Sequence, residues 1–224
     1  MSISQDAHLS TSVGDYLKAI WTVSNSKPAS TNAIAEVLGV SSPSVSAMLA
    51  RLQDSGLIEY ERYRGVRLTE QGEREALRLM RRHRLLETFM IEHLGYSWDE
   101  VHDEAEVIEH VISDRFTERL AALLDHPTHD PHGDPIPSLD GNLPNTPNTP
   151  LTAVDIGAAL LLSRLRTQDA DVLAYLAKLG IHPGQRVLVL EREPLGGLLH
   201  IEIGGRRVVI SKELATLVRG EVIE

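Results

Sequence analysis

The sequence predicts a mainly α-helical chain with a small β component: a helical head, a helical middle region and a small C-terminal β-barrel. Three observations predict this class. The first seventy residues alternate helix-length segments with turn signals, residues 69–94 form one long amphipathic pattern, and short β runs follow residue 151. With 224 residues, 42% of them hydrophobic, the chain is long enough for two or three packed domains.

Two helices are predicted at the start of the head. Residues 10–23 combine a serine-rich cap with apolar residues at helical spacing. Residues 31–38 form a shorter helix that ends at Gly39, because glycine readily adopts the left-handed conformation that follows a helix.

A third helix and a β-hairpin complete the head. The helix is expected to have Ser42 as its N-cap and Pro43 at its first position. Residues 57–69 then read as two short strands around a turn at Arg64-Gly65. Helix, helix, turn, helix and hairpin is the order of a winged helix-turn-helix, which we assign to residues 1–72.

The middle region, residues 73–140, is predicted to be helical. A long amphipathic helix fills residues 69–94, Ser97 and Glu100 form a capping box for the next helix, and Ser113 starts a further one. Five apolar residues of these helices are expected in the core or in a dimer interface: Leu85, Leu86, Phe89, Val107 and Val111.

A segment rich in Pro, Asn and Asp follows at residues 126–150. It is predicted to pack at residues 131–139 and to be mobile at residues 142–150, and residues 141–151 are assigned as the linker. Its histidines are expected to be exposed to solvent: His126, His129 and His132.

The C-terminal domain is assigned to residues 152–224. Three β runs with glycine-rich turns, at residues 186–193, 198–204 and 206–212, and one short helix at residues 170–180 predict a small β-barrel.

Charge and composition indicate which kinds of partner and site the chain can have. The net charge is −10, of which residues 1–75 contribute −2, residues 76–140 contribute −8 and residues 141–224 contribute nothing. Cations are therefore the expected partner of the middle region. The chain has no cysteine, which excludes disulfides, thiolate metal sites and thiol catalysis. No signal or membrane-spanning pattern is present, so a cytoplasmic protein without a membrane partner is expected.

One charged stretch, EVHDEAEVIEH at residues 100–110, concentrates imidazoles and carboxylates on a predicted helix. His102, Glu106 and Glu109 fall on one narrow strip, with His110 at its edge. Carboxylates gathered in this way repel one another unless a cation lies between them. The alternative interpretation is a solvated acidic face beside the core face of the helix.

A second pair favours the metal interpretation. His83 and Glu87 lie four residues apart on the preceding helix. Two helices joined by a short loop usually pack antiparallel, so this pair is expected to converge with the strip. A site of imidazoles and carboxylates without sulfur suits Mn²⁺, Fe²⁺ or Zn²⁺.

Several motifs together resemble a known family. They are SSPSVSAMLARL in the head, MRRHRLLETFM and VHDEAEVIEHVISD in the middle region, and PHGDPIPSL beyond it. In combination they resemble the metal-dependent transcriptional repressors of the diphtheria toxin repressor family (DtxR/MntR), over nearly the whole chain. The resemblance implies a DNA-binding head, a metal-binding and dimerisation domain, and an SH3-like (FeoA-like) C-terminal domain.

The resemblance also implies two metal sites. The primary, activating site corresponds to Asp15, Glu106, Glu109 and His110. The ancillary site corresponds to His83, Glu87 and His102, with Asp169 as a weak further candidate from the SH3-like domain.

Two departures from the iron-responsive members bear on the choice of metal. Those members have Met at the position of Asp15 and Cys at that of Glu106, and this chain has a carboxylate at both. Hard oxygen in place of soft sulfur favours Mn²⁺, with Fe²⁺ as an alternative and Co²⁺, Zn²⁺ or Cd²⁺ as substitutes in vitro. The compact manganese-responsive members have Glu where this chain has Lys18, so their close two-metal geometry is not expected.

The head is expected to bind a palindromic double-stranded operator as part of a homodimer, with recognition helices about 34 Å apart. The candidate contacts open the recognition helix or lie on it and on the wing: Ser41, Ser42, Pro43, Ser44, Ser46, Arg51, Arg62, Arg64 and Arg67. By charge alone, the arginines of the wing are equally well explained as solvated hairpin residues.

The function predicted from these observations is a metal-dependent repressor of metal uptake genes, with manganese as the activating metal. An iron-responsive regulator of the same family is the alternative. A dinuclear metallohydrolase is a third possibility, because carboxylates and histidines also hold catalytic ions. The DNA-binding head argues against an enzyme.

Overall fold

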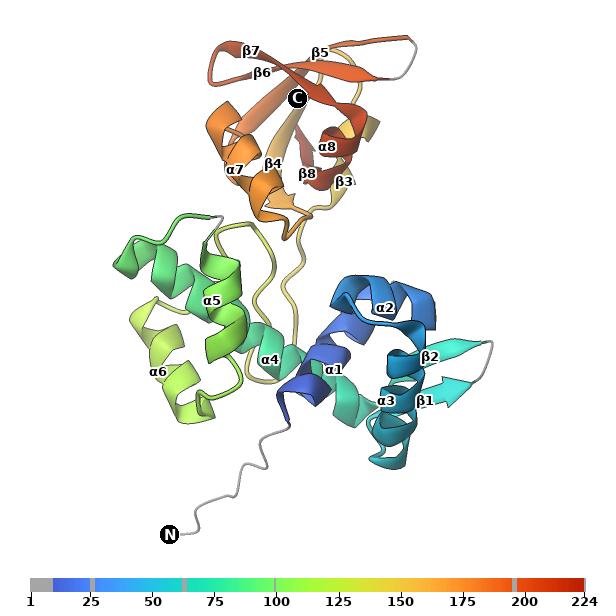
Figure 1. Cartoon of the computed structure of the whole chain (residues 1–224). Helices are drawn as coiled ribbons and strands as arrows, with labels where there is room; N and C mark the ends of the chain where they lie inside the picture. Colours follow the sequence, from blue (N-terminus) through green and yellow to red (C-terminus); the bar gives the residue numbers. More distant parts are fainter. Residues whose placement is uncertain (1–9, 25–26, 62–63, 99, 195–196, 224) are drawn as a thin grey trace. The chain divides into compact units, whose positions relative to one another are not determined.

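The computed structural model describes residues 10–24, 27–61, 64–98, 100–194 and 197–223 (Figure 1). The chain forms two compact units. Unit 1 contains residues 1–83, 107–113 and 137–142, and unit 2 contains residues 84–106, 114–136 and 143–224. Each unit is described by itself.

The winged helix-turn-helix predicted for the head is confirmed in unit 1. Its elements are α1 (Thr11–Val23), α2 (Thr31–Leu38), α3 (Ser42–Asp54), β1 (Ile58–Glu61) and β2 (Gly65–Leu68). Gly39 ends α2 in the left-handed conformation. The two strands pair antiparallel from Ile58 opposite Leu68 to Glu61 opposite Gly65, and this hairpin projects from the head in Figure 1.

The start of α3 differs from the prediction by one residue. Ser41, and not Ser42, is the N-cap, because Ser41 has extended backbone angles and its hydroxyl accepts the backbone N–H of Ser44. Pro43 is therefore the second residue of the helix, where its missing N–H still leaves no hydrogen bond unmade.

The apolar stripes of the three helices meet in one core. Leu17 and Ile20 of α1, Ile34 of α2, and Val45 and Leu49 of α3 are fully buried in it. The exposed face of α3 is therefore its polar face, and this core holds the recognition helix in position.

The long helix predicted at residues 69–94 is α4 (Glu70–Phe89), which continues as a π-helical turn, η1 (Met90–Leu94). The side chain of Thr69 caps its start by accepting the N–H of Gly72, and Gly95 ends it with φ of 74°. The π-helical turn is not predictable from the apolar periodicity, which continues through it.

The next helix, α5 (Val101–Ile108), is shorter than predicted. It starts at Val101, later than the capping box predicts, although the carboxylate of Glu100 accepts both the N–H and the hydroxyl of Ser97. It ends at Ile108, so Glu109 and His110 lie in a turn and not on a continuous helical strip. Helix α6 (Asp114–Leu123) follows.

The proline-rich segment after α6 is irregular, and only its central part is buried. Residues 132–137 are buried, and Asp130 organises their turn by accepting the N–H groups of His132 and Asp134. The expected packing of residues 131–139 is thus confirmed for its first part. The expectation that all three histidines are exposed is wrong for His132, which is fully buried.

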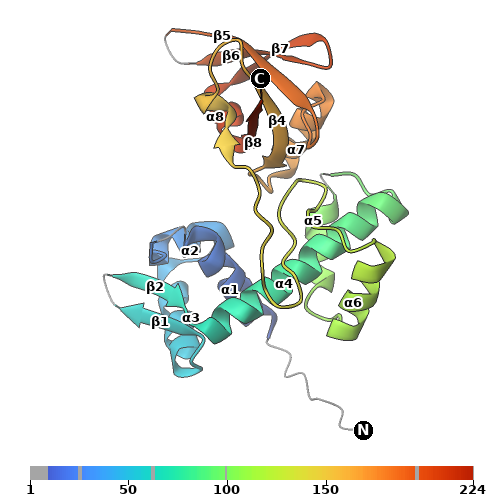
Figure 2. The same ribbon diagram turned by 180° about the vertical axis from the view of Figure 1, so that it is seen from behind.

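The C-terminal domain is an antiparallel sheet of six strands in the order β3-β8-β4-β5-β6-β7. Figure 2 shows β4 to β8 of this sheet together with α7 and α8. The strands are β3 (Thr149–Pro150), β4 (Ala159–Leu165), β5 (Arg186–Arg192), β6 (Leu198–Ile203), β7 (Arg206–Ser211) and β8 (Val218–Ile223). The helical pieces are η2 (Leu151–Ala153), α7 (Ala170–Leu179) and α8 (Lys212–Leu217). The three predicted strands correspond to β5, β6 and β7. The sequence did not reveal β4 and β8, which lie between β3 and β5 in the sheet.

The core of this domain is aliphatic. Leu160 and Leu162 of β4, Leu173 of α7 and Ile201 of β6 are buried in it, and Trp98 packs against it. Among the described residues, no single helix is long and apolar enough to cross a membrane. Helices α2 and α3 meet that test only as a pair, and they are bent by 108°.

Candidate metal centres

Three of the predicted primary ligands lie together in unit 1. Asp15 of α1 reaches His110, with 2.9 Å between Oδ1 and Nε2. The same nitrogen lies 3.4 Å from Oε1 of Glu109. Glu109 is completely buried and the side chain of His110 is 6% exposed. Two carboxylates and an imidazole, from segments far apart in the sequence, therefore form one cluster, which we call the Glu109 cluster.

Two further side chains contact Glu109. The ammonium of Lys18 lies 2.7 Å from Oε1, and Nδ1 of His83 lies 2.6 Å from Oε2. The expected repulsion among carboxylates is therefore offset at Glu109 by a lysine. His83, which the resemblance assigned to the ancillary site, contacts a predicted primary ligand.

Helix α1 approaches the cluster closely because of a glycine. A Cβ atom at Gly14 would lie 2.6 Å from Leu79 Cδ1 and 3.0 Å from His110 Cε1. Asp15 and Lys18 are three residues apart and so lie on one face of α1. The side chains of Asp15 and Lys18 can therefore reach the neighbouring residues His110 and Glu109.

The remaining predicted ligands lie in unit 2. Glu87 of α4 contacts His102 of α5, with 3.3 Å between Oε1 and Nδ1, and His102 Nε2 lies 4.0 Å from Oε1 of Glu106. Asp169 is exposed and caps α7 by accepting the N–H of Val172. Within the described part of the chain, Asp169 belongs to none of the groups of side chains that are close enough to share an ion.

A further group in unit 2 was missed in the sequence. Glu87, Asp130 and His132 are all buried, and one ligand atom from each lies within 4.8 Å of the others. Asp130 Oδ2 and both ring nitrogens of His132 are buried without a hydrogen-bond partner among the described residues. The only local signal is the spacing of Asp130 and His132, two residues apart between prolines. We call this group the His132 cluster.

The electrostatics of the His132 cluster favour a positive charge, which the guanidinium of Arg84, 3.8 Å from Oδ2 of Asp130, already supplies in part. Burial, reinforced by the charges of Asp134 and Glu87, raises the pKa of Asp130 to about 7. Burial alone would lower the pKa of His132, but the carboxylate of Glu87 and the charges of Asp130 and Asp134 raise it. Two buried carboxylates and an imidazole with unsatisfied nitrogens match the ligands of Mn²⁺, Fe²⁺ or Zn²⁺.

The predicted DNA contacts are placed on the surface of the head. Ser41, Pro43, Ser44 and Ser46 at the start of α3 are exposed, as are Arg51, Arg64 and Arg67, whereas Ser42 is half-buried and donates to Asn32. Arg64 pairs with Glu61 at 2.9 Å. Arg62 lies outside the described residues. The exposed N-terminus of α3 offers backbone N–H groups and hydroxyls, which suit phosphate.

Some of the apolar residues predicted to lie in the core or in a dimer interface are buried, and others are exposed to solvent. Leu85 and Leu86 are buried, whereas Val107 and Val111 are 72% and 76% exposed. On α6, Phe116 and Leu123 are also exposed and lie on one helix face. Apolar side chains this exposed are typical of an interaction surface.

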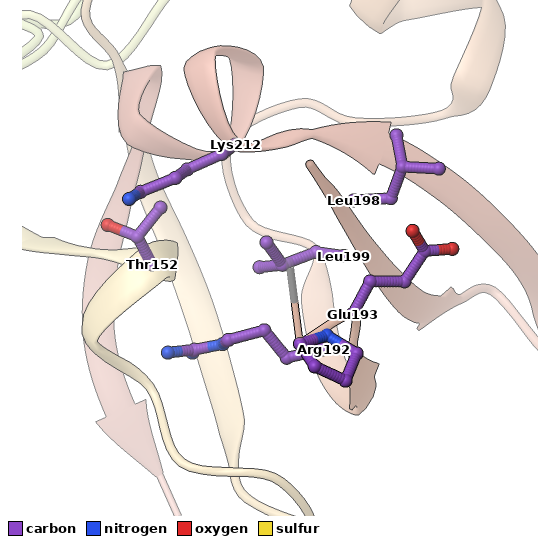
Figure 3. Close-up of a pocket in the computed structure, with 7 residues that line it drawn as sticks. Thr152, Arg192, Glu193, Leu198, Leu199 and Lys212 are labelled. Carbon is purple, nitrogen blue, oxygen red and sulfur yellow. The ribbon is translucent and has the colours of Figure 1, made fainter. Parts of the chain in front are cut away.

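A small hollow in the C-terminal domain contains none of the predicted ligands or DNA contacts. It has a volume of about 170 Å³ and is lined by Thr152, Arg192, Glu193, Pro194, Leu198, Leu199 and Lys212 (Figure 3). The guanidinium of Arg192 already donates to the carbonyl of Val154 at 2.9 Å, which gives this arginine a structural role.

Three known families match successive parts of the chain. Residues 8–66 match the N-terminal DNA-binding domain of iron-dependent repressors. Residues 69–138 match the metal-binding and dimerisation domain of the same repressors, and residues 149–222 match the FeoA domain.

Full-length relatives are also similar. The iron-dependent repressor IdeR of Mycobacterium leprae is 34% identical over 202 residues, which cover 85% of this chain and 87% of that protein. Among solved structures, a manganese-dependent transcriptional repressor in complex with manganese is 41% identical, with a TM-score of 0.86 over 93% of this chain and 100% of that one. The structure of ScaR with bound Zn²⁺ is 33% identical, with a TM-score of 0.80 over 93% and 98% of the two chains.

Proposed function

Because this chain belongs to the diphtheria toxin repressor family of metal-dependent, DNA-binding transcriptional repressors, we propose that it is a homodimeric repressor of metal uptake genes that Mn²⁺ activates. The observation that carries the choice of metal is the ligand set of the Glu109 cluster. Asp15, Glu109 and His110 offer only oxygen and imidazole nitrogen, and the chain has no cysteine. Such a set suits Mn²⁺ better than it suits softer ions.

Asp15, Glu109 and His110 are the proposed primary ligands, with Glu106, one turn earlier on α5, as the fourth. The contact of Asp15 with His110 supports this assignment, since the two residues belong to α1 and to the turn after α5. An ion bound there supplies the positive charge that two carboxylates need when they approach each other. Asp15 would orient α1 toward the ion, and Glu109, buried without exposure, would hold the ion away from water.

A second ion is proposed at the His132 cluster. Glu87 would serve both His132 and His102, because its carboxylate lies 3.8 Å from Nδ1 of the first and 3.3 Å from Nδ1 of the second. Together with His83, Glu87 and His102 were the predicted ancillary ligands. The unsatisfied nitrogens of His132 support its inclusion. Asp169 is retained only as a weak candidate, because it caps α7.

The proposed mechanism is a shift between domain orientations. Asp15, Glu109 and His110 would hold the ion between α1 and the turn after α5, and these shared contacts would favour one position of the winged head relative to the dimerisation surface. In a two-fold dimer, that position would present the two α3 helices about 34 Å apart, the separation of successive major grooves. Moving such a population from 1:99 to 99:1 requires about 5.5 kcal/mol of differential metal binding.

The experiment is a fluorescence anisotropy titration of a palindromic operator with full-length protein in Mn²⁺, anaerobic Fe²⁺, Co²⁺ or Zn²⁺. Mn²⁺ is expected to activate DNA binding at concentrations at which iron does not. Asp15→Met and Glu106→Cys are expected to move the preference toward iron. An unchanged order of metals in both variants would contradict the ligand argument.

The iron-responsive alternative has one observation in its favour. The chain is 34% identical to a repressor that is named for its dependence on iron. Affinity alone does not separate the two metals, because Fe²⁺ generally binds such sites at least as tightly as Mn²⁺. The same titration decides the question: activation by Fe²⁺ at lower concentration than Mn²⁺ would select the alternative. The metallohydrolase is set aside, since the family consists of transcriptional repressors.

A further inference from the structure

One cation is already present among the proposed primary ligands. Nζ of Lys18 lies 2.7 Å from Oε1 of Glu109, with 16% of the lysine side chain and none of the glutamate side chain exposed. A pair this far from water is weakly screened by salt and by solvent. The ammonium therefore has a strong effect on any second cation that approaches Glu109.

We propose that Lys18 sets the metal threshold of this site: its ammonium competes with the divalent ion for Glu109, and the ion binds by exchange with it. The inference rests on the proposed role of Glu109 as a ligand. It adds to that role the residue that opposes the ion and thereby determines how much metal the repressor needs.

The contacts of Glu109 require an exchange. Its Oε2 contacts Nδ1 of His83 at 2.6 Å, and its Oε1 is shared between Lys18 at 2.7 Å and His110 at 3.4 Å. An ion that binds either oxygen at coordination distance enters space that these groups occupy. The two histidines can themselves become ligands as neutral imidazoles, whereas a lysine ammonium carries no lone pair. Lys18 is therefore the group that must withdraw.

Helix geometry makes withdrawal feasible. Lys18 lies one turn beyond Asp15 on α1, and its long side chain retains 16% exposure, so the ammonium can turn toward solvent while the backbone stays in place. Asp15 then stays beside His110, and the metal ion takes the place of the Lys18 ammonium at the carboxylate of Glu109.

A purely structural role for Lys18 makes a different prediction. If the lysine only neutralises a buried carboxylate, its removal destabilises the fold and does not improve metal binding. If it competes with the ion, its removal destabilises the protein without metal and tightens metal binding at the same time. The two roles therefore differ in the sign of the change in metal affinity.

The test uses the full-length protein carrying His132→Ala, which removes an imidazole from the other candidate cluster. The dissociation constant for Mn²⁺ is measured by isothermal titration calorimetry, and the melting temperature is measured after treatment with chelator. Lys18→Met is expected to bind Mn²⁺ about tenfold more tightly, because a positive charge close to the ion is gone. Its melting temperature in chelator is expected to fall, and the increase produced by Mn²⁺ is expected to grow.

Two controls accompany this variant. Lys18→Arg keeps the charge and is expected to remain within about threefold of the parent protein, on the same electrostatic argument. Lys27→Met removes an exposed lysine of the same unit and is expected to change neither quantity.

Unchanged or weaker Mn²⁺ binding by Lys18→Met overturns the proposal. Failure of the proposed function gives a different result, because Glu109→Gln would then bind Mn²⁺ as tightly as the parent. If Glu109→Gln loses Mn²⁺ and Lys18→Met does not gain affinity, the ligand assignment stands and only the role of Lys18 fails.

Discussion

The indole ring of Trp98 meets the imidazole ring of His132 edge to face, with 5.2 Å between the ring centroids and 76° between the ring planes. Trp98 also packs against the core of the C-terminal domain and lies 6.3 Å from the ring of His182. One aromatic side chain therefore connects a candidate metal ligand to the core of the SH3-like domain.

This contact predicts that the fluorescence of Trp98 reports metal binding at the His132 cluster. In a Trp21→Phe background, which leaves Trp98 as the one tryptophan, Mn²⁺ is expected to change the emission intensity, because an ion at His132 alters the field and the quenching at the adjacent indole. The measurement is a fluorescence titration of the full-length protein.

His132→Ala is expected to abolish this response, whereas Asp15→Asn, in the Glu109 cluster, is expected to preserve it. A full response in the His132→Ala variant would show that the fluorescence change arises elsewhere.

The raised pKa of Asp130 predicts that the stability of the folded chain depends on pH. The pKa of Asp130 in the folded chain is raised from the usual 3.8 to about 7, so between these values the folded state binds more protons than the unfolded state. The free energy of unfolding in chelator is therefore expected to fall as pH rises from about 4 to about 7. The raised pKa of His132 acts in the same direction. Urea unfolding across this range measures the slope.

Asp130→Asn is expected to flatten that slope, because the amide oxygen can still accept the N–H groups of His132 and Asp134 without a titrating charge. Asp155→Asn, at an exposed aspartate of unit 2, is the matched control. A variant at Asp130 with the parent slope would contradict the prediction.

The close packing around Gly133 predicts that a methyl group added there lowers the free energy of unfolding substantially. The φ of Gly133 is +86°, and a Cβ atom would lie 1.8 Å from the backbone oxygen of Ser163 in β4. Gly157 has the same φ and no atom within 4 Å of such a Cβ, so it isolates the cost of the backbone conformation. Gly157→Ala is expected to cost about 1 kcal/mol, and Gly133→Ala about 2 kcal/mol more, because the backbone must shift. Equal losses in urea unfolding would show that the close approach is unimportant.

Arg67 predicts a salt-dependent contribution to DNA binding. It is exposed on β2 of the wing, where it suits a phosphate contact. Arg67→Ala is expected to weaken binding to all sequences alike and to lower the slope of log affinity against log salt by about 1. Arg186→Ala, at an exposed arginine of the C-terminal domain, should leave the slope unchanged. A loss of affinity for one operator alone would instead indicate a base contact.

Val111 predicts where two copies of the chain meet. Its side chain is 76% exposed, and the region belongs to a family of dimerisation domains. Val111→Asp is expected to weaken the dimer by about 2 kcal/mol or more, because the buried charge occurs twice in a two-fold interface. Sedimentation velocity measures this change. Ile156→Asp, at a residue 62% exposed in unit 2, is the control, and a dimer unaffected by Val111→Asp would place the interface elsewhere.

Much of the fold could be predicted because local signals agree with the tertiary structure. Gly39 and Gly95 end their helices in the left-handed conformation, and Glu100 accepts the N–H of Ser97, which is one half of the predicted capping box. Strand β4 could not be predicted, because its first four residues, ALLL, form a short apolar run that periodicity does not distinguish from part of a buried helix.

The arrangement of the candidate metal ligands was harder to predict from local sequence patterns. Helical spacing placed Glu109 and His110 on the strip of α5, yet the helix ends at Ile108 and both residues lie in a turn. Asp130 and His132 belong to a proline-rich segment without periodicity. Their burial results from packing against α4 and β4, and no local signal encodes that packing.

The sequence by itself determined the order of elements and the chemistry available for a metal, because periodicity, caps and the absence of cysteine are properties of the chain. Only the tertiary structure decided which side chains share a cluster. Lys18 meets Glu109, and His132 approaches Glu87, across segments far apart in the sequence. The physical reason is that hydrogen bonding and side-chain spacing act over a few residues, whereas burial and charge pairing depend on which distant segments pack together.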